Sequence, residues 1–268
     1  MIETAYAKIN LALHVRRRRE DGYHEIETLF AFVDDGDKLT ASPASHDVVH
    51  VKGEFAGALV DPFGNIVSKA LNSFKHVPGW SVSLDKRLPV AAGLGGGSAD
   101  AGAVIRMVER WSGLPDDWRT RAARLGADVP ACVESVTCLG RGTGTELEPI
   151  ASDLAGMPVL LANPRVPLAT GPVFQAWDGI DRGSLPEGAA RDVMLAGRND
   201  LEAPAIGLCP AIAEVLSALR GTAPLLTRMS GSGASCFALY ADGDVMERAL
   251  ADLRARHPGW WFLSGNLR

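Results

Sequence analysis

Residues 89–99 have the sequence PVAAGLGGGSA, and this stretch decides the fold. Its glycines, too dense for regular secondary structure, are Gly93, Gly95, Gly96 and Gly97. The residues that follow, up to Gly113, have the pattern of a helix that begins near Ser98. Backbone N–H groups in such a loop can converge on one anion, and a helix N-terminus favours phosphate. The stretch therefore predicts a phosphate-binding loop, with a flexible loop and a serine helix cap as the alternative.

The spacing of these glycines separates the loop from two other nucleotide-binding loops. No GK[ST] follows them, as a P-loop requires, and they lack the GxGxxG spacing of dinucleotide-binding folds. The sequence therefore predicts a phosphate site of a different type.

A second glycine-rich stretch, MSGSGAS, covers residues 229–235. Gly231 and Gly233 allow the backbone to approach a ligand closely. The alternative is a tight hairpin turn between two strands.

The first strand carries polar residues of chemical interest. From Ala5 to Val15 the sequence alternates, and this pattern predicts a strand with one buried face. Lys8, Asn10 and His14 share the polar face, with Lys8 and Asn10 roughly 6.6 Å apart along the strand. Lys8 could contact a transferring phosphate or a reacting hydroxyl, and the alternative is the solvated face of an edge strand.

Asp128 follows a helix stop at Gly126 and precedes Pro130. This position is typical of a helix N-cap with proline in the first turn. The functional alternative is a carboxylate that accepts a proton from a substrate hydroxyl.

Four consecutive arginines, Arg16–Arg19, precede an Asp-Gly pair. Such a run can bind nucleic acid or a membrane surface. We interpret the segment 16–22 instead as a solvated turn between two strands.

The composition is that of a globular protein of 268 residues, with 47% apolar residues, 22% charged residues and a net charge of −5. The acidic balance argues against nucleic-acid binding, so an anionic substrate requires a local positive site. Four cysteines without CxxC spacing or a histidine cluster argue against zinc and against a disulfide framework. We expect reduced thiols in the core.

The N-terminus enters a strand pattern at once and lacks the features of a signal peptide. No apolar run approaches the roughly 18 residues of a membrane span. We therefore expect a cytoplasmic protein with no membrane partner.

Strands and helices alternate irregularly along the chain, which favours an α+β fold over a strict βαβ repeat. Helical spacing is expected over residues 65–77, and strands over 23–33 and 38–43. The pattern changes near residue 150, so we predict two domains, 1–150 and 151–268.

Taken together and in this order, residues 89–99 and 229–234 resemble the phosphate loop and the C-terminal glycine motif of the GHMP kinases. This resemblance implies an N-terminal domain like ribosomal protein S5 domain 2 and a ferredoxin-like C-terminal domain. It also implies an active site between the two domains.

The segments 5–15 (AYAKINLALHV), 21–30 (DGYHEIETLF) and 125–130 (LGADVP) closely resemble the diphosphocytidyl-methylerythritol kinase subfamily. The resemblance implies transfer of a phosphoryl group from ATP, with Mg²⁺, to a hydroxyl of a small-molecule substrate. It implies Lys8 and Asp128 as the catalytic pair. No nucleic-acid, membrane or obligatory protein partner is expected. A homoserine- or mevalonate-type kinase and a non-catalytic ligand sensor of the same fold are the alternatives.

The resemblance also implies two sets of binding residues. Those expected to bind ATP are Asn65, Lys86, Pro89, Gly93, Leu94, Gly95, Gly96, Gly97, Ser98 and Ala99. Those expected to bind the cytidine substrate are Asn10, Tyr23, His24, Thr170, Phe174, Gly231, Ser232 and Gly233. The chain has Ala99-Asp100 where several relatives have Ser-Asn, and Asp100 could point away along the helix or help to hold the metal.

Overall fold

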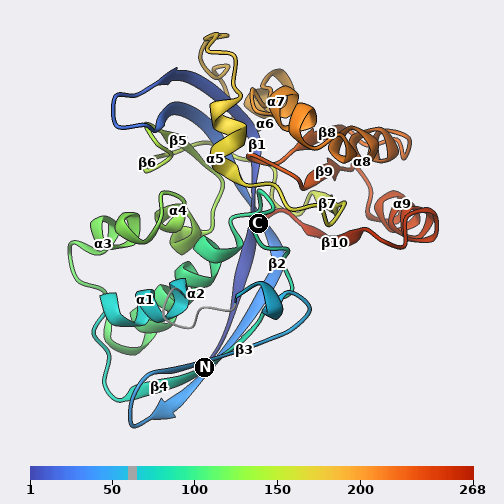
Figure 1. Ribbon diagram of the computed structural model, residues 1–268. Coiled ribbons are helices and arrows are strands. Elements are labelled where there is room, and N and C mark those ends of the chain that lie inside the picture. The colour runs from blue at the N-terminus through green and yellow to red at the C-terminus, as the bar shows by residue number, and fades with distance from the viewer. Residues whose placement is uncertain (60–64) are drawn as a thin grey trace. The chain divides into compact units, whose positions relative to one another are not determined.

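The computed structural model describes residues 1–59 and 65–268 (Figure 1). The chain forms two compact units, and neither is a continuous segment. Unit 1 comprises Met1–Lys8, Asp35–Val90 and Gly95–Ser135; unit 2 comprises Ile9–Asp34, Ala91–Leu94 and Val136–Arg268. The strands β1 (Ile2–Arg18) and β2 (His24–Ala44) contribute residues to both units. The two-domain boundary near residue 150 stays a prediction.

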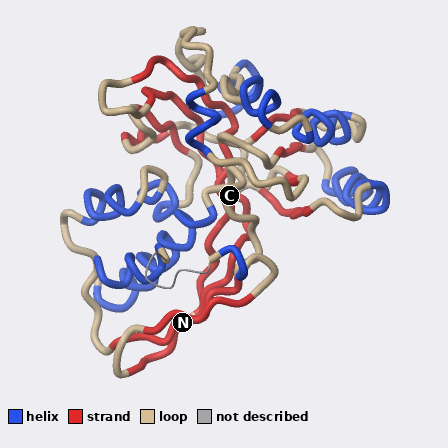
Figure 2. The backbone as a smooth tube through the Cα atoms, viewed as in Figure 1, coloured by secondary structure: helices blue, strands red, loops and turns tan. Residues whose placement is uncertain are grey.

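Unit 1 combines paired strands with several helices (Figure 2). Its remaining elements are β3 (Val48–Lys52), a short 3-10 helix (Ala56–Ala58), α1 (Ile66–Ser73), β4 (Gly79–Asp85), α2 (Gly96–Ser112), α3 (Trp118–Leu125) and α4 (Val129–Glu134). β4 pairs antiparallel with residues 38–44 of β2 and parallel with β3. Trp80, Val82 and Leu84 alternate along β4 and are buried, as a period of two requires.

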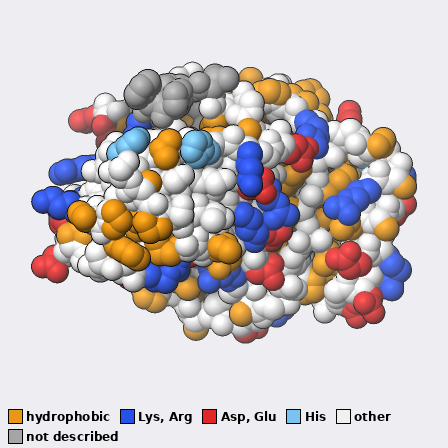
Figure 3. All heavy atoms as spheres, turned by 90° about the horizontal axis from the view of Figure 1, so that it is seen from below, with side chains coloured by type: hydrophobic (Ala, Val, Ile, Leu, Met, Phe, Trp, Pro, Cys, Tyr) orange, Lys and Arg blue, Asp and Glu red, His pale blue; other side chains and the backbone are white. Residues whose placement is uncertain are grey.

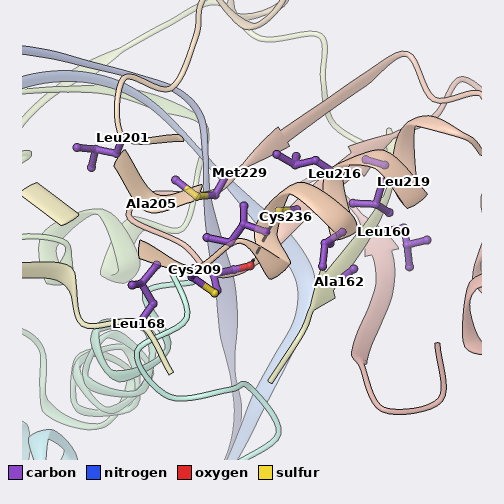
Figure 4. Close-up of a cluster of buried hydrophobic side chains, with 14 of the residues drawn as sticks. Leu160, Ala162, Leu168, Leu201, Ala205, Cys209, Leu216, Leu219, Met229 and Cys236 are labelled. Carbon is purple, nitrogen blue, oxygen red and sulfur yellow. Dashed lines mark hydrogen bonds between the residues drawn. The ribbon is translucent and has the colours of Figure 1, made fainter. Parts of the chain in front are cut away.

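Unit 2 contains a four-stranded antiparallel sheet in the order β10-β7-β9-β8. Its elements are β5 (Cys138–Arg141), β6 (Glu146–Pro149), β7 (Pro158–Asn163), α5 (Thr170–Gln175), α6 (Ala190–Ala196), α7 (Glu202–Leu208), α8 (Ala211–Arg220), β8 (Leu226–Met229), β9 (Cys236–Leu239), α9 (Gly243–Arg256) and β10 (Trp261–Asn266). Leu160 and Cys236 on the sheet belong to one core cluster with Leu216 and Leu219 of α8 (Figure 4). All four cysteines are buried thiols, as expected.

The first strand differs from the expectation because both of its faces are buried. Lys8, Asn10 and His14 are 4%, 2% and 0% exposed. Asn10 donates to the Thr28 hydroxyl at 2.8 Å, and the His14 ring contacts the Gly183 carbonyl at 3.1 Å. Alternation of polar and apolar residues shows which face carries the polar side chains, but not whether that face is exposed. Here the polar side chains have partners inside the protein. The expectation of a half-buried strand was therefore wrong.

Three expected boundaries were also wrong. β1 continues to Arg18, so the turn is confined to residues 19–23, where Arg19 N–H donates to the Tyr23 carbonyl. β2 is one strand where two were expected. α1 ends at Ser73, and Val77 is 84% exposed. Because Pro78 disfavours helical conformation in the residue before it, the helix cannot extend to Val77.

The expected ends of α2 at Gly113 and of α3 at Gly126 are confirmed. The short helices α6 and α7 were not expected. Within the described ranges, no helix is both long and apolar enough to cross a membrane.

Candidate functional site

The glycine-rich loop leads into α2, which begins at Gly96 rather than near Ser98. Gly95 is the N-cap, with φ 60° and ψ 21°, a left-handed conformation that favours glycine. A Cβ at this position would also lie 2.9 Å from Cε of Lys8. Among the described residues no side chain caps this helix, so the alternative of a serine cap at Ser98 was wrong. The first N–H groups of a helix have no acceptor within the helix and can bind an anion. In α2 the residues that carry them include Gly96 and Gly97.

Lys8 and Asp128 form an ion pair, with Nζ 3.0 Å from Oδ2. The Lys8 side chain is 5% exposed and that of Asp128 is 30% exposed, so a ligand can still reach the carboxylate. Asp128 occupies the N-cap position of α4, but in the described part of the chain its side chain makes no capping hydrogen bond. The Asp128 carboxylate therefore pairs with Lys8 and does not cap α4. Because Lys8 also packs against Gly95, the ion pair lies beside the start of α2.

Behind the loop lies a buried cluster of three charged residues that we call the Lys86 cluster: Lys86, Asp37 and Asp100. Lys86 is 1% exposed, and its Nζ lies 2.5 Å from Asp37 Oδ2 and 2.7 Å from Asp100 Oδ2. The other oxygen of Asp37 accepts hydrogen bonds from two backbone N–H groups, those of Arg87 and Leu88. A Cβ on Gly96 would lie 3.1 Å from Lys86 Nζ, so the cluster supports the first turn of α2 from behind.

The protonation of the Lys86 cluster follows from its burial. Burial raises the pKa of Asp100 to about 8; the Lys86 ammonium opposes this rise, and the Asp37 carboxylate adds to it. Asp100 therefore binds its proton more tightly in the folded protein than an exposed aspartate does. Asp100 Oδ1 is buried and has no hydrogen-bond partner among the described residues. Asp100 neither points away along the helix nor reaches outward as a metal ligand would, since it faces Lys86.

The other residues expected to bind ATP support or line the loop. Asn65 is 8% exposed and caps α1, its side-chain oxygen accepting the Val67 N–H at 2.9 Å. Leu94 and Ala99 are buried, whereas Gly97 is exposed. Lys86 lies in the buried cluster described above.

In unit 2 the second glycine stretch is a turn between β8 and β9 that packs on the beginning of the phosphate loop. Ser230 Oγ donates to the Gly93 carbonyl at 2.8 Å and accepts the Asn10 N–H at 3.2 Å. A Cβ on Gly93 would lie 2.2 Å from the Ser230 carbonyl oxygen, so only glycine fits there. Asn199 donates to the Met229 and Gly231 carbonyls, both at 2.8 Å. The stretch therefore forms the hairpin turn that was the alternative, and the approach of its backbone to a ligand stays a prediction.

Aromatic rings gather where the cytidine substrate was expected. The rings of His24 and Phe174 have centroids 5.0 Å apart, and Trp177 meets His24 edge-on at 5.8 Å. Thr170 and Ser232 lie 3.0 Å apart through their hydroxyls. Tyr23 is 64% exposed, so its ring is open to solvent.

The imidazole of His24 is adapted to hydrogen bonding in its neutral form. Burial lowers the pKa of His24, and the nearby Arg18 guanidinium lowers it further. His24 Nε2 and Trp177 Nε1 are buried and have no hydrogen-bond partner among the described residues.

Several residues of the site were missed by the sequence analysis. No sequence pattern indicated that Asp37 belongs to the site, because an acidic residue in a strand does not by itself predict a buried lysine as its partner. Ser230 lies within the glycine stretch but was not separated from it. Trp177 follows Phe174 by three residues, and that helical spacing could have indicated it.

Comparison with known proteins agrees with this arrangement. Residues 65–136 match the family described as GHMP kinases N terminal domain, and residues 184–259 match GHMP kinases C terminal. The chain is similar to a protein of Novosphingobium aromaticivorans named 4-diphosphocytidyl-2-C-methyl-D-erythritol kinase, with 70% identity over 266 residues, 99% of this chain and 92% of the relative. A protein of Erythrobacter litoralis with the same name is 58% identical over 270 residues, 99% of each chain.

Solved structures show the same fold. A crystal structure of 4-(cytidine 5'-diphospho)-2C-methyl-D-erythritol kinase has a TM-score of 0.83 at 34% identity, covering 100% of this chain and 99% of that chain. Homoserine kinase from Cytophaga hutchinsonii has a TM-score of 0.74 at 17% identity, covering 99% and 94% of the two chains. The second likeness concerns the fold alone.

The Lys86 cluster predicts how stability depends on pH. The pKa of Asp100 is raised from 3.8 to about 8 in the folded protein, so folding binds its proton more tightly. Stability from this group is complete below pH 4 and decreases as the pH rises to about 8, by at most about 1.4 kcal/mol per pH unit. Asp100→Asn removes the ionisation. The free energy of unfolding of the variant, relative to that of the wild type, should therefore increase from pH 4 to about pH 8 and stay constant above that pH.

Urea unfolding of both proteins from pH 5 to pH 9 measures this difference. Asp117→Asn is the matched control, because the pKa of the exposed Asp117 is lowered by its hydrogen bond with Arg121. A difference between Asp100→Asn and wild type that does not change with pH would contradict the assignment of the proton.

Proposed function

This chain belongs to the GHMP kinases and, within them, to the 4-diphosphocytidyl-2-C-methyl-D-erythritol kinases, and from that membership we propose how its residues perform the transfer. It is a kinase that uses ATP as co-substrate. The acceptor is a hydroxyl of 4-diphosphocytidyl-2-C-methyl-D-erythritol, in the methylerythritol phosphate route to isoprenoid precursors. The observation that carries the proposal is the Lys8–Asp128 ion pair, 3.0 Å long, beside the glycine start of α2.

The triphosphate of ATP binds at the start of α2. The N–H groups of Gly96, Gly97 and Ser98 occupy the first turn, where the helix itself supplies no acceptors. The partial positive charge of the helix N-terminus adds to their attraction for phosphate. Positioning and charge stabilisation of this kind supply most of the rate in phosphoryl transfer.

Mg²⁺ supplies neutralisation of the phosphate oxygens when it is bound. Within residues 1–59 and 65–268 there is no group of three or more His, Cys, Asp or Glu side chains that could hold a metal ion. The two carboxyl groups of the Lys86 cluster are engaged by an ammonium. In our proposal the metal would therefore bind together with ATP and would supply positive charge beside the phosphates.

Asp128 orients the acceptor hydroxyl and accepts its proton. Its side chain is partly exposed, and Lys8 holds one of its oxygens in place. The Lys8 ammonium also stabilises negative charge that develops on the transferring group. A positioned base of this kind contributes about 10²–10⁴ in rate.

The cytidine end of the substrate binds to residues of unit 2. Phe174 offers a half-buried ring, and the His24 ring lies beside it with the two centroids 5.0 Å apart. Stacking of the base on an aromatic ring and hydrogen bonds to its edge together select cytosine. Asn10, Tyr23, Thr170 and residues 231–233 complete this set in our proposal.

The direct test is a coupled assay of ADP release with the cytidine diphospho-substrate, homoserine and mevalonate in parallel. We expect turnover with the first alone, and loss of that turnover when Mg²⁺ is chelated. Calorimetry should show tight Mg²⁺ binding only when a nucleotide is present. Turnover of homoserine or mevalonate at a comparable kcat/KM, or tight Mg²⁺ binding without nucleotide, would reject the proposal.

Asp128→Asn and Asp128→Ala test the base. Each should lower kcat by about 10²–10⁴ with little change in the KM for ATP. Lys8→Ala should have a similar effect on kcat, because it releases the carboxylate. Asp117→Ala, an exposed aspartate at the start of α3, is the control and should keep wild-type kcat. A folded Asp128→Ala protein with nearly normal kcat would remove Asp128 from the mechanism.

Phe174→Ala tests the base-binding ring. Base–aromatic stacking contributes about 1–3 kcal/mol, so the KM for the cytidine substrate should rise by about 5- to 150-fold while that for ATP changes little. Phe174 also packs against the core of unit 2, so the melting temperature is measured alongside. An unchanged KM for the cytidine substrate in a protein that melts early would assign Phe174 to the core alone.

A further inference from the structure

The four arginines Arg16–Arg19 make two kinds of contact: within the β1–β2 hairpin, and between the hairpin and residues 175–181. Arg17 pairs with Glu25 at 3.5 Å, and Arg19 pairs with Asp21 and Glu25, so both stabilise the β1–β2 hairpin itself. Arg16 and Arg18, two residues apart on β1, share one face of the strand and contact residues 175–181. The guanidinium groups are thus occupied within the chain.

The charged side chains are also mixed on the face of the molecule shown in Figure 3, where Lys and Arg are interspersed with Asp and Glu.

Arg18 binds the C-terminal end of α5. Its Nη2 donates to the Trp177 carbonyl at 2.6 Å and to the Gln175 carbonyl at 3.1 Å. The last carbonyl groups of a helix have no donors within it, and a cation there is favourable. α5 has only six residues, so it has little stability of its own and depends on such contacts.

Arg16 fixes the segment that follows α5. It binds Asp181 through two hydrogen bonds of 2.9 and 3.0 Å, and Glu27 through a third of 2.7 Å. The other oxygen of Glu27 accepts the Leu185 N–H at 2.7 Å. The chain is therefore attached to the hairpin at three successive points, near residues 177, 181 and 185.

α5 carries the residues that we assign to the cytidine substrate. At its beginning Thr170 meets Ser232, and near its end the Phe174 ring lies against His24. The last turn, where Phe174 lies, is held by the Arg18 hydrogen bonds together with the burial of Val173 and Trp177 in the core of unit 2. Loss of the Arg18 bonds would leave apolar packing to hold the end of α5, and the Phe174 ring would have more freedom to move relative to His24.

We propose that Arg18 is a positioning residue for the cytidine site, which holds the end of α5 so that Phe174 and His24 present a preformed surface to the base. The inference rests on the proposed function of Phe174. A ring that is already in place loses less conformational freedom on binding, and this preorganisation increases affinity. The same guanidinium helps to lower the pKa of His24, which keeps the imidazole neutral.

The experiment compares Arg18→Ala and Arg18→Lys with the neighbour Arg17→Ala. Arg17 is the matched control, because its side chain is 71% exposed and pairs only across the hairpin in the contacts described. We expect Arg18→Ala to raise the KM for the cytidine substrate about 10-fold, with kcat and the KM for ATP unchanged. Arg18→Lys should recover part of the affinity, because an ammonium can still donate to one carbonyl. Arg17→Ala should behave as wild type.

A double-mutant cycle with Phe174→Ala tests whether Arg18 acts through the ring. If it does, adding Arg18→Ala to Phe174→Ala should raise the KM little further. Full additivity, an unchanged KM in Arg18→Ala, or an equal rise in both KM values overturns the inference. If Arg18→Ala does not fold, the same comparison is made with Arg18→Lys and Arg18→Gln, and wild-type KM values in both overturn it. Absence of turnover in the wild type would instead contradict the proposed function.

Discussion

Two lysine side chains pack against two consecutive glycines at the start of α2, and the rest of unit 1 depends on this arrangement. Lys8 lies against Gly95, and Lys86 lies against Gly96. A β-carbon at either position would approach a lysine side-chain atom to about 3 Å. The absence of two side chains thus brings two ammonium groups close to the N-terminus of a helix. Each ammonium then requires a carboxylate, and this requirement determines where Asp128, Asp37 and Asp100 lie.

The ammonium groups of Lys8 and Lys86 differ in the exposure of the carboxyl groups that pair with them. Lys86 is enclosed by two carboxyl groups and is almost completely buried, and its binding to ATP stays a prediction. Lys8 pairs with Asp128, whose side chain is 30% exposed. Breaking a buried ion pair leaves an uncompensated charge and is strongly destabilising, whereas a partly exposed pair can exchange partners with a ligand. Both lysines are buried beside the same loop, and the exposure of their carboxylate partners is what distinguishes them.

The sequence predicted the loop, the first strand and Asp128, because each has a local signature of glycine spacing, alternation or helix boundary. It could not predict the Lys86 cluster. Asp37 and Asp100 are separated by 63 positions in the numbering, and no short-range pattern indicates that both face one lysine. The same limitation explains the burial of Asn10 and His14, whose partners come from distant segments. The length of β2 was missed because Asp34–Gly36 resembles a turn, while pairing with neighbouring strands extends the strand on both sides.

The discontinuous units have a consequence for the order of synthesis. The core of unit 2 includes Leu13, Val15 and Ile26 from the beginning of the chain together with Leu250 and Leu253 from its end. Val33 and Leu267 form a bridge, and the Arg268 N–H donates to the Phe32 carbonyl. During translation, residues 9–34 therefore emerge long before the partners that bury them, whereas all of unit 1 has emerged by residue 135. A ribosome-bound chain must keep this apolar hairpin from aggregating until the last helix and strand are made, and chaperones are the cell's means of protecting such a segment.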